Sequence, residues 1–292
     1  MKLALKIDVQ TVRGTHQGVP RLVELLQKHN ATASFFFCVG PDHSGRMLKR
    51  LLRGNLLKYY GLPSLFYGTL LPGPDIGKQC GDIMRKARDA GFEVGLQAYD
   101  AAAWSNHAAQ STAGWCEKQM RLGRERFAEI FGEPPAAHAA AGWQMNLYAY
   151  RLTQRLGFVY CSDTRGRCPF IPIYRGEIIA CPQLPTTLPT LDEAIKSAGM
   201  GAAADHVLNL STNPPATGHL YTLRAELEGM KLTPLFERLL QGWRAQGYEL
   251  VATRELYSSL ETTKLPRHEV TLGKLPGSSE TLMLQTKEFL AG

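Results

Sequence analysis

The sequence predicts an α/β fold in which parallel strands alternate with helices, arranged as a sheet or a barrel. Short apolar runs and amphipathic stretches follow one another in a repeated strand-then-helix order. The 292 residues suffice for one large α/β domain or two small ones. Hydrophobic residues make up 44% and charged residues 20%, which is ordinary for a globular protein, and no run approaches the roughly 20 apolar residues that span a bilayer.

The first elements are the most strongly patterned. Residues 3–9 (LALKIDV) are predicted to be a strand, and residues 20–29 (PRLVELLQKH) a helix with proline near its start. Residues 32–39 (TASFFFCV) are predicted to be a buried strand because they are rich in aromatic residues. Together they form a strand–helix–strand unit.

The same order continues along the chain. Further strands are predicted at residues 92–98, 158–161, 177–182, 219–224 and 248–252, and helices at 77–90, 114–131, 145–156 and 233–246. This repetition favours a barrel, for which the chain length is usual.

Two segments depart from this order. The spacing of apolar and basic residues predicts a basic amphipathic helix over residues 43–60. Such a helix could lie on an anionic membrane surface, or it could be an ordinary solvated helix that packs on the barrel. Residues 262–292 are rich in Thr, Ser, Gly, Lys and Pro, and we expect a loosely structured tail outside a domain that covers residues 1–261.

Charge and cysteine usage narrow the partners and the compartment. A net charge of +7 favours anionic partners such as phosphates or a membrane surface, whereas the absence of a long Lys/Arg run argues against nucleic acid. The opening MKLALKIDVQ has too short an apolar run for a signal peptide, so we expect a cytoplasmic protein, with peripheral contact to the inner membrane as an option. None of the six cysteines forms a CxxC pair, and isolated cysteines are most often small buried residues.

Polar residues gather where the predicted strands end, which is the edge of a parallel α/β fold that carries function. They are Asp8, Gln10, residues 97–103, His138 with Gly142 and Trp143, Asp163, Arg165, Arg224, Glu226 and Glu228.

Around these positions lie several motifs in a fixed order: IDVQTVRGTHQGVPRL, VGPDHSGR, FEVGLQAYDAAAW, HAAAGWQMN, YCSDTRG, PQLPTTLPTLDE and YTLRAELEG. Over about residues 1 to 260 the chain therefore resembles the polysaccharide deacetylases of the NodB-homology class. The resemblance implies a distorted (β/α) barrel and a hydrolase of the C–N amide bond of an N-acylated sugar. The members that it resembles most are deformylases of lipid A modification, whose formamido-arabinose is linked to undecaprenyl phosphate.

The resemblance also implies a metal site and two proton carriers. The class has an Asp-x-Asp that supplies a general base and a ligand, a His-x-x-x-His that supplies two ligands, and a later His as general acid. A divalent ion such as Zn²⁺ polarises the amide and lowers the pKa of its bound water. On this match Asp8 is the base, Arg224 stands at the acid position, and Gln10, Gln97 and Ala101 stand at the three ligand positions.

These substitutions change what the site is expected to do. Two neutral amides hold Zn²⁺ poorly compared with a carboxylate and two imidazoles, and alanine offers no donor. A guanidinium stays charged, so Arg224 cannot donate a proton. We therefore expect no tightly bound metal and a weakly active or inactive chain. An active chain needs another ligand set, for which the nearest candidates are Asp100, Asp163, Glu226 and Glu228.

The resemblance implies that Asp163 and Arg165 line the substrate groove, with Arg165 pairing with the phosphate of a lipid-linked sugar. His138, Gly142, Trp143 and Glu226 are further candidates for substrate binding. A structural role remains open for each of these residues. His138 could simply bond to the backbone, and Gly142 could form a tight turn beside a buried Trp143. Asp163 and Arg165 could pair to order a loop, and Glu226 could partner Arg224.

Three functions follow from these residues. The first is hydrolysis of an N-acylated, lipid-linked sugar. The second is non-catalytic binding of the same sugar. The third, which the residues favour least, is a glycosidase with two carboxylates such as Asp8 and Glu226, whose carboxyl groups need to be about 5–5.5 or 6.5–9.5 Å apart.

Overall fold

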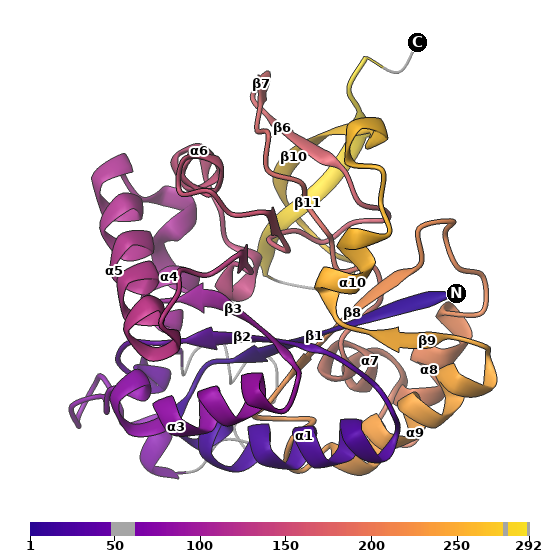
Figure 1. Cartoon of the computed structure of the whole chain (residues 1–292), viewed down its shortest axis with the longest axis horizontal. Coiled ribbons are helices and arrows are strands. Elements are labelled where there is room, and N and C mark those ends of the chain that lie inside the picture. Colours follow the sequence, from indigo (N-terminus) through magenta and orange to yellow (C-terminus); the bar gives the residue numbers. More distant parts are fainter. Residues whose placement is uncertain (48–61, 277–279, 291–292) are drawn as a thin grey trace.

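A computed structural model of the chain describes residues 1–47, 62–276 and 280–290. Its centre is a curled parallel sheet of seven strands in the order β5-β4-β3-β2-β1-β8, with β9 also paired to β1 (Figure 1). The strands are β1 (Lys2–Val9), β2 (Ser34–Cys38), β3 (Glu93–Ala98), β4 (Ala137–His138), β5 (Tyr160–Cys161), β8 (His219–Arg224) and β9 (Glu249–Val251). The predicted barrel-type α/β fold is confirmed.

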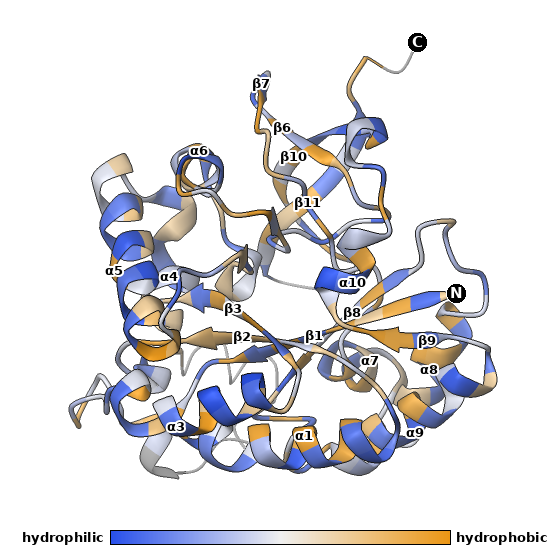
Figure 2. Cartoon of the chain, viewed as in Figure 1, coloured by the Kyte–Doolittle hydropathy of each residue, from blue (hydrophilic) through white to orange (hydrophobic). Residues whose placement is uncertain are grey.

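Helices pack around this sheet. They are α1 (Val19–Lys28), α3 (Ile76–Asp89), α4 (Ala101–His107), α5 (Ala113–Phe131), α6 (Leu147–Arg155), α7 (Leu191–Ala198), α8 (Ala203–Leu210), α9 (Thr233–Ala245) and α10 (Thr253–Ser258). Short turns of helix are η1 (Gly14–Gly18), η2 (Ser44–Met47), η4 (Leu62–Leu65), η5 (Ala108–Gln110), η6 (Ala141–Trp143) and η7 (Thr262–Lys264). Figure 2 shows apolar strands at the centre and helices that carry polar residues as well as apolar ones. The helices expected near α1, α3, α5, α6 and α9 are therefore confirmed.

Alternation along β1 places the first site residue. Leu3, Leu5, Ile7 and Val9 are fully buried in the main core. Because successive strand residues point to opposite faces, Lys6 and Asp8 share the other face. That face also carries Ala4, which packs in a second apolar cluster with Phe36 of β2 and Leu220 of β8. Lys6 and Asp8 therefore sit in the interior of the curled sheet.

The C-terminal segment is not a loose tail, contrary to the expectation for residues 262–292. It forms β10 (Arg267–Lys274) and β11 (Thr281–Glu288), which join β6 (Ile171–Tyr174) and β7 (Glu177–Ile178) in a second sheet of order β11-β10-β6-β7. Val270, Leu282 and Met283 are buried, so a few apolar residues among polar ones suffice for strands that keep one face in solvent. The limit of the first domain at residue 261 stays a prediction.

The basic amphipathic helix predicted over 43–60 falls mostly on residues 48–61, which lie outside the described residues. Only its beginning is seen, where Ser44–Met47 form η2. Among the described residues, no helix combines the length and apolar character needed to cross a membrane.

Candidate functional site

The candidate site lies at the carboxyl edge of the central sheet, where β1 and β8 end together. Asp8 is paired in register with Phe36 of β2 on one side and with Arg224 of β8 on the other. The chain then leaves β1 and turns through η1, so Gln10 stands just beyond the sheet. The sequence match that placed Asp8, Gln10 and Arg224 near one another agrees with this register.

Asp8 is a buried carboxylate held against a buried ammonium. Its Oδ1 lies 3.8 Å from Nζ of Lys6, and both side chains are nearly inaccessible to solvent. Burial raises the pKa of Asp8, while the positive charges of Lys6 and Arg224 oppose that rise. Oδ1 of Asp8 has no hydrogen-bond partner among the described residues. The family's base position is thus intact and its charge is balanced by a side chain.

The residues at the three ligand positions do not fit a divalent ion. Oε1 of Gln97, its only atom suited to a metal, accepts a hydrogen bond from the Cys38 thiol at 3.2 Å. Its Nε2, which cannot ligate, is buried without a hydrogen-bond partner in the described part of the chain. Ala101 has no donor, and Gln10 offers only a neutral amide.

Glu226 braces the turn after β1. Its Oε1 accepts hydrogen bonds from the backbone N–H of Gln10 at 2.8 Å and from the N–H and hydroxyl of Thr11 at 3.0 Å each. Burial raises its pKa. A side chain added at Gly14 would collide with the Glu226 carboxylate, which explains a glycine there. Glu226 therefore binds the turn that follows β1. The alternative in which Glu226 partners Arg224 is not observed among the described ion pairs, in which Arg224 pairs with Asp192.

Arg224 is held by an acidic residue of α7 and by its own turn. Its Nη2 lies 3.2 Å from Oδ2 of Asp192. Its backbone N–H donates to Oε2 of Glu228 at 2.9 Å, and burial raises the pKa of Glu228 to about 8. Glu228 thus closes the turn after β8. A permanently charged, ion-paired Arg224 offers electrostatic stabilisation at this edge but no proton.

Asp100, one candidate for a replacement ligand, has two structural partners. It caps α4 by accepting from the N–H of Ala103 at 2.9 Å, and its other oxygen lies 2.6 Å from Nδ1 of His43. The sequence reasoning did not single out His43. The only signal for it is its place after β2, within the motif VGPDHSGR.

His138, at the end of β4, and Asp163, just after β5, form a buried pair. Nδ1 of His138 lies 2.8 Å from Oδ1 of Asp163, which also accepts from the N–H of Ala140 at 2.8 Å. Oδ2 of Asp163 accepts from Nε2 of Gln183 at 3.1 Å. Both side chains are at most 1% exposed, so the structure places these two predicted substrate-binding residues together but out of contact with solvent.

Trp143 stands between two cations. Nζ of Lys6 lies 5.3 Å from its ring centre and the Arg165 guanidinium 5.1 Å from it. Gly142 and Trp143 both have positive φ values, 65° and 52°, and this strained turn sets the ring in place. The tight turn beside a buried Trp is therefore observed, and Trp143 forms an inner wall of the site.

Arg165 is committed to structural partners. Its Nη1 binds both carboxylate oxygens of Glu193 at 2.9 and 3.0 Å, and its Nη2 donates to the carbonyl of Leu188 at 3.0 Å. Its side chain is 7% exposed. The loop-ordering alternative thus describes Arg165 better than pairing with a phosphate, although its ion partner is Glu193 rather than Asp163.

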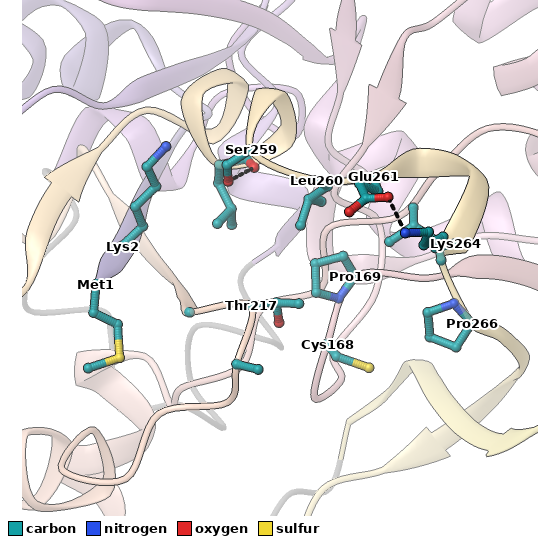
Figure 3. Close-up of a pocket in the computed structure, with 14 residues that line it drawn as sticks. Met1, Lys2, Cys168, Pro169, Thr217, Ser259, Leu260, Glu261, Lys264 and Pro266 are labelled. Atoms are coloured by element: carbon teal, nitrogen blue, oxygen red, sulfur yellow. Dashed lines mark hydrogen bonds and ion pairs between the residues drawn. The ribbon is translucent and has the colours of Figure 1, made fainter.

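A cavity lies elsewhere, away from these residues. It has a volume of about 550 Å³ and is lined by Met1, Lys2, Cys168, Thr217 and the turn at 259–266, among others (Figure 3). Met1 and Lys2 open β1, and Thr217 precedes β8. This cavity is therefore at the amino edge of the sheet, opposite Asp8 and Arg224.

Comparisons with known proteins identify the family and the fold. No family model matches the chain. It is 38% identical over 264 residues, 87% of this chain and 85% of the relative, to the "Probable 4-deoxy-4-formamido-L-arabinose-phosphoundecaprenol deformylase ArnD" of Shewanella sediminis. It is 31% identical over 284 residues, 94% of this chain and 99% of the relative, to the protein of the same name from Wigglesworthia glossinidia brevipalpis.

The solved structures agree on the fold. The "probable Polysaccharide deacetylase" of Pseudomonas aeruginosa superposes with a TM-score of 0.59 at 15% identity, covering 88% of this chain and 89% of that one. At that identity the likeness shows the fold alone, and the curated relatives carry the assignment. The chain belongs to the family of 4-deoxy-4-formamido-L-arabinose-phosphoundecaprenol deformylases, built on the fold of the polysaccharide deacetylases.

Proposed function

We propose that this chain binds an N-acylated amino sugar carried on undecaprenyl phosphate and hydrolyses its amide bond weakly or not at all. The substrate class comes from the names of its two relatives, which describe a phosphoundecaprenol-linked formamido sugar. The loss of activity rests on one observation: the amide oxygen of Gln97 is occupied by Cys38, and Ala101 offers no donor. Without a bound ion the attacking water keeps the high pKa of bulk water, and Asp8 alone cannot activate it.

Binding does not require the ion. The strands that form the carboxyl edge are kept, and Asp8 and Arg224 still lie side by side where β1 and β8 end. The carboxylate-pair glycosidase stays the lower alternative, because Glu226 is only 2% exposed and its Oε1 is held by Gln10 and Thr11.

An apolar loop beside the site supports a lipid-linked ligand and contact with a membrane. Phe66, Leu70 and Leu71 are 42%, 78% and 47% exposed. Hydrogen bonds from the N–H groups of residues 69, 70 and 71 to the carbonyl of Phe66 make the loop a compact turn. Gly68 packs on His43, which binds Asp100, so the loop adjoins the carboxyl edge. Clustered exposed apolar side chains are typical of a lipid contact.

A calorimetric titration of the full chain with the undecaprenyl-phosphate-linked formamido sugar tests the proposal, with formate release measured in parallel. We expect saturable binding with little or no formate. Absence of binding would remove the proposal. Formate release at a rate typical of enzymes, of about 1 s⁻¹ or more, would instead make the chain an active deformylase.

The loop makes a separate prediction. Leu70→Ser together with Leu71→Ser should weaken binding of the lipid-linked sugar about 10-fold or more, since each buried apolar side chain contributes roughly 1.5–3 kcal/mol. Binding of a lipid-free formamido sugar phosphate should not change. Val159→Ser is a matched control, because Val159 is 48% exposed and precedes β5 at the opposite edge. Equal losses for both ligands would mean that the loop acts on the site rather than on the lipid.

A further inference from the structure

A second group of metal-binding side chains lies outside the family's ligand positions. His138, Cys161 and Asp163 each offer a donor atom, and these atoms lie within 4.8 Å of one another. All three residues are buried, and within the described residues they form the single such group of His, Cys, Asp or Glu. A fourth donor lies next to Cys161, because the two sulfur atoms of Cys161 and Cys181 are 3.4 Å apart. Cys181 lies outside the group defined by the 4.8 Å limit, so its thiol has to turn toward His138 and Asp163 to complete a four-ligand site. The proposed sugar-binding function uses none of these atoms.

The spacing suits a small tetrahedral ion. Zn²⁺ bonds to sulfur, nitrogen and oxygen are about 2.0–2.3 Å long, so its ligand atoms are about 3.3–3.8 Å apart. The two sulfur atoms, 3.4 Å apart, need to separate by about 0.4 Å, because two Zn–S bonds of about 2.3 Å place them about 3.8 Å apart. The nitrogen and oxygen of His138 and Asp163, 2.8 Å apart, need to separate by only about 0.5 Å to reach the lower end of that range.

The surroundings hold the donors in place. Asp163 accepts hydrogen bonds from the N–H of Ala140 and from Gln183, which fix the carboxylate as partners of metal ligands do. The His138 ring packs against Trp104 and Phe158, with ring centres 6.0 and 5.4 Å away. These rings keep water from the imidazole. Two thiolates and a carboxylate carry one negative charge more than a dication neutralises, and the Lys6 ammonium, which interacts with Asp163, offsets that charge.

We propose that His138, Cys161 and Asp163, with Cys181 as the fourth donor, form a buried structural zinc site beneath the carboxyl edge. Thiolate and imidazole donors select zinc over Mg²⁺ or Ca²⁺. Binding releases the thiol protons to solvent and involves no redox step. Because the site is closed, the ion enters during folding rather than by diffusion into the folded chain.

The test is metal analysis of the full chain expressed in zinc-supplemented medium, followed by unfolding and refolding with Co²⁺. We expect about one equivalent of zinc, and a near-ultraviolet thiolate-to-cobalt absorption band after refolding. Cys161→Ser should weaken the band, because one of the two thiolates is lost, and should lower zinc affinity at least about 10–100-fold; His138→Gln should lower the affinity to a similar extent. Cys116→Ser is the matched control, since Cys116 is equally buried but its thiol bonds Asn146.

Two results overturn the proposal. One is a folded, unaltered chain that binds no zinc and shows no cobalt band. The other is zinc that stays bound in a folded Cys161→Ser or His138→Gln variant, which would place the ion elsewhere. If Cys161→Ser fails to fold, the His138→Gln variant and the cobalt band of the unaltered chain still decide the question.

Discussion

Restoring the three ligand positions is expected to create a metal-dependent deformylase. In a chain carrying Gln10→Asp, Gln97→His and Ala101→His, the carboxylate and two imidazoles replace two neutral amides and a methyl group. These are donors that hold a divalent ion and lower the pKa of its water to about 7. We expect one additional equivalent of divalent metal and a rise in formate release of at least about 10³-fold, because losses at a ligand exceed the 10–100-fold typical of its supporting partners.

Two further substitutions in the restored chain serve as controls. Adding Asp8→Asn should abolish the gain in rate while the added metal stays bound, because Asp8 then supplies no base. Adding Arg224→His should raise the rate further, by up to the 10²–10⁴-fold typical of a positioned general acid. A chain that gains the ion but no formate release would show that the groove no longer positions the sugar amide. An unaltered chain that is already as fast as the restored one would contradict the proposed loss of activity.

The fold was predictable where local periodicity and burial agree. The apolar alternation of β1 and the aromatic run of β2 define buried parallel strands, and the helical spacing of α9 needs no tertiary partner to be recognised. The short helices α7, α8 and α10 have at most eight residues, too few to show a helical period clearly. The strands β10 and β11 were missed because they keep one polar face, which in isolation resembles a tail.

The sequence predicted which residues lie at the site, but not which way their side chains point. The order of motifs places Asp8, Gln97 and Arg224 near one edge, and the register of β1 with β8 agrees with it. No sequence pattern says that the Gln97 carbonyl turns toward Cys38, 59 residues earlier, because only the folded sheet brings them together. For the same reason Arg165 was expected to face a phosphate, whereas it binds Glu193 in the first turn of α7.

The buried ammonium of Lys6 is expected to be the largest single contributor to stability within the site. It donates to the carbonyl of Ser162 at 3.1 Å and lies 3.8 Å from Asp8. Burial lowers the pKa of Lys6, and the negative charges of Asp8 and Asp163 oppose that shift. Lys6→Met keeps the length of the side chain but leaves two buried carboxylates without their cation. We expect the free energy of unfolding to fall by about 3–5 kcal/mol, measured by chemical denaturation.

The same substitution at an exposed ion pair separates charge burial from charge itself. Lys28 pairs with Glu237 at 2.7 Å, but its side chain is 67% exposed, so Lys28→Met should cost less than about 1 kcal/mol. Adding Asp8→Asn to Lys6→Met should recover part of the loss, because a neutral amide no longer needs the cation. If Lys6→Met costs no more than Lys28→Met, then Asp8 does not depend on this ammonium for its charge balance. Arg224, the second cation near Asp8, would then have to provide it.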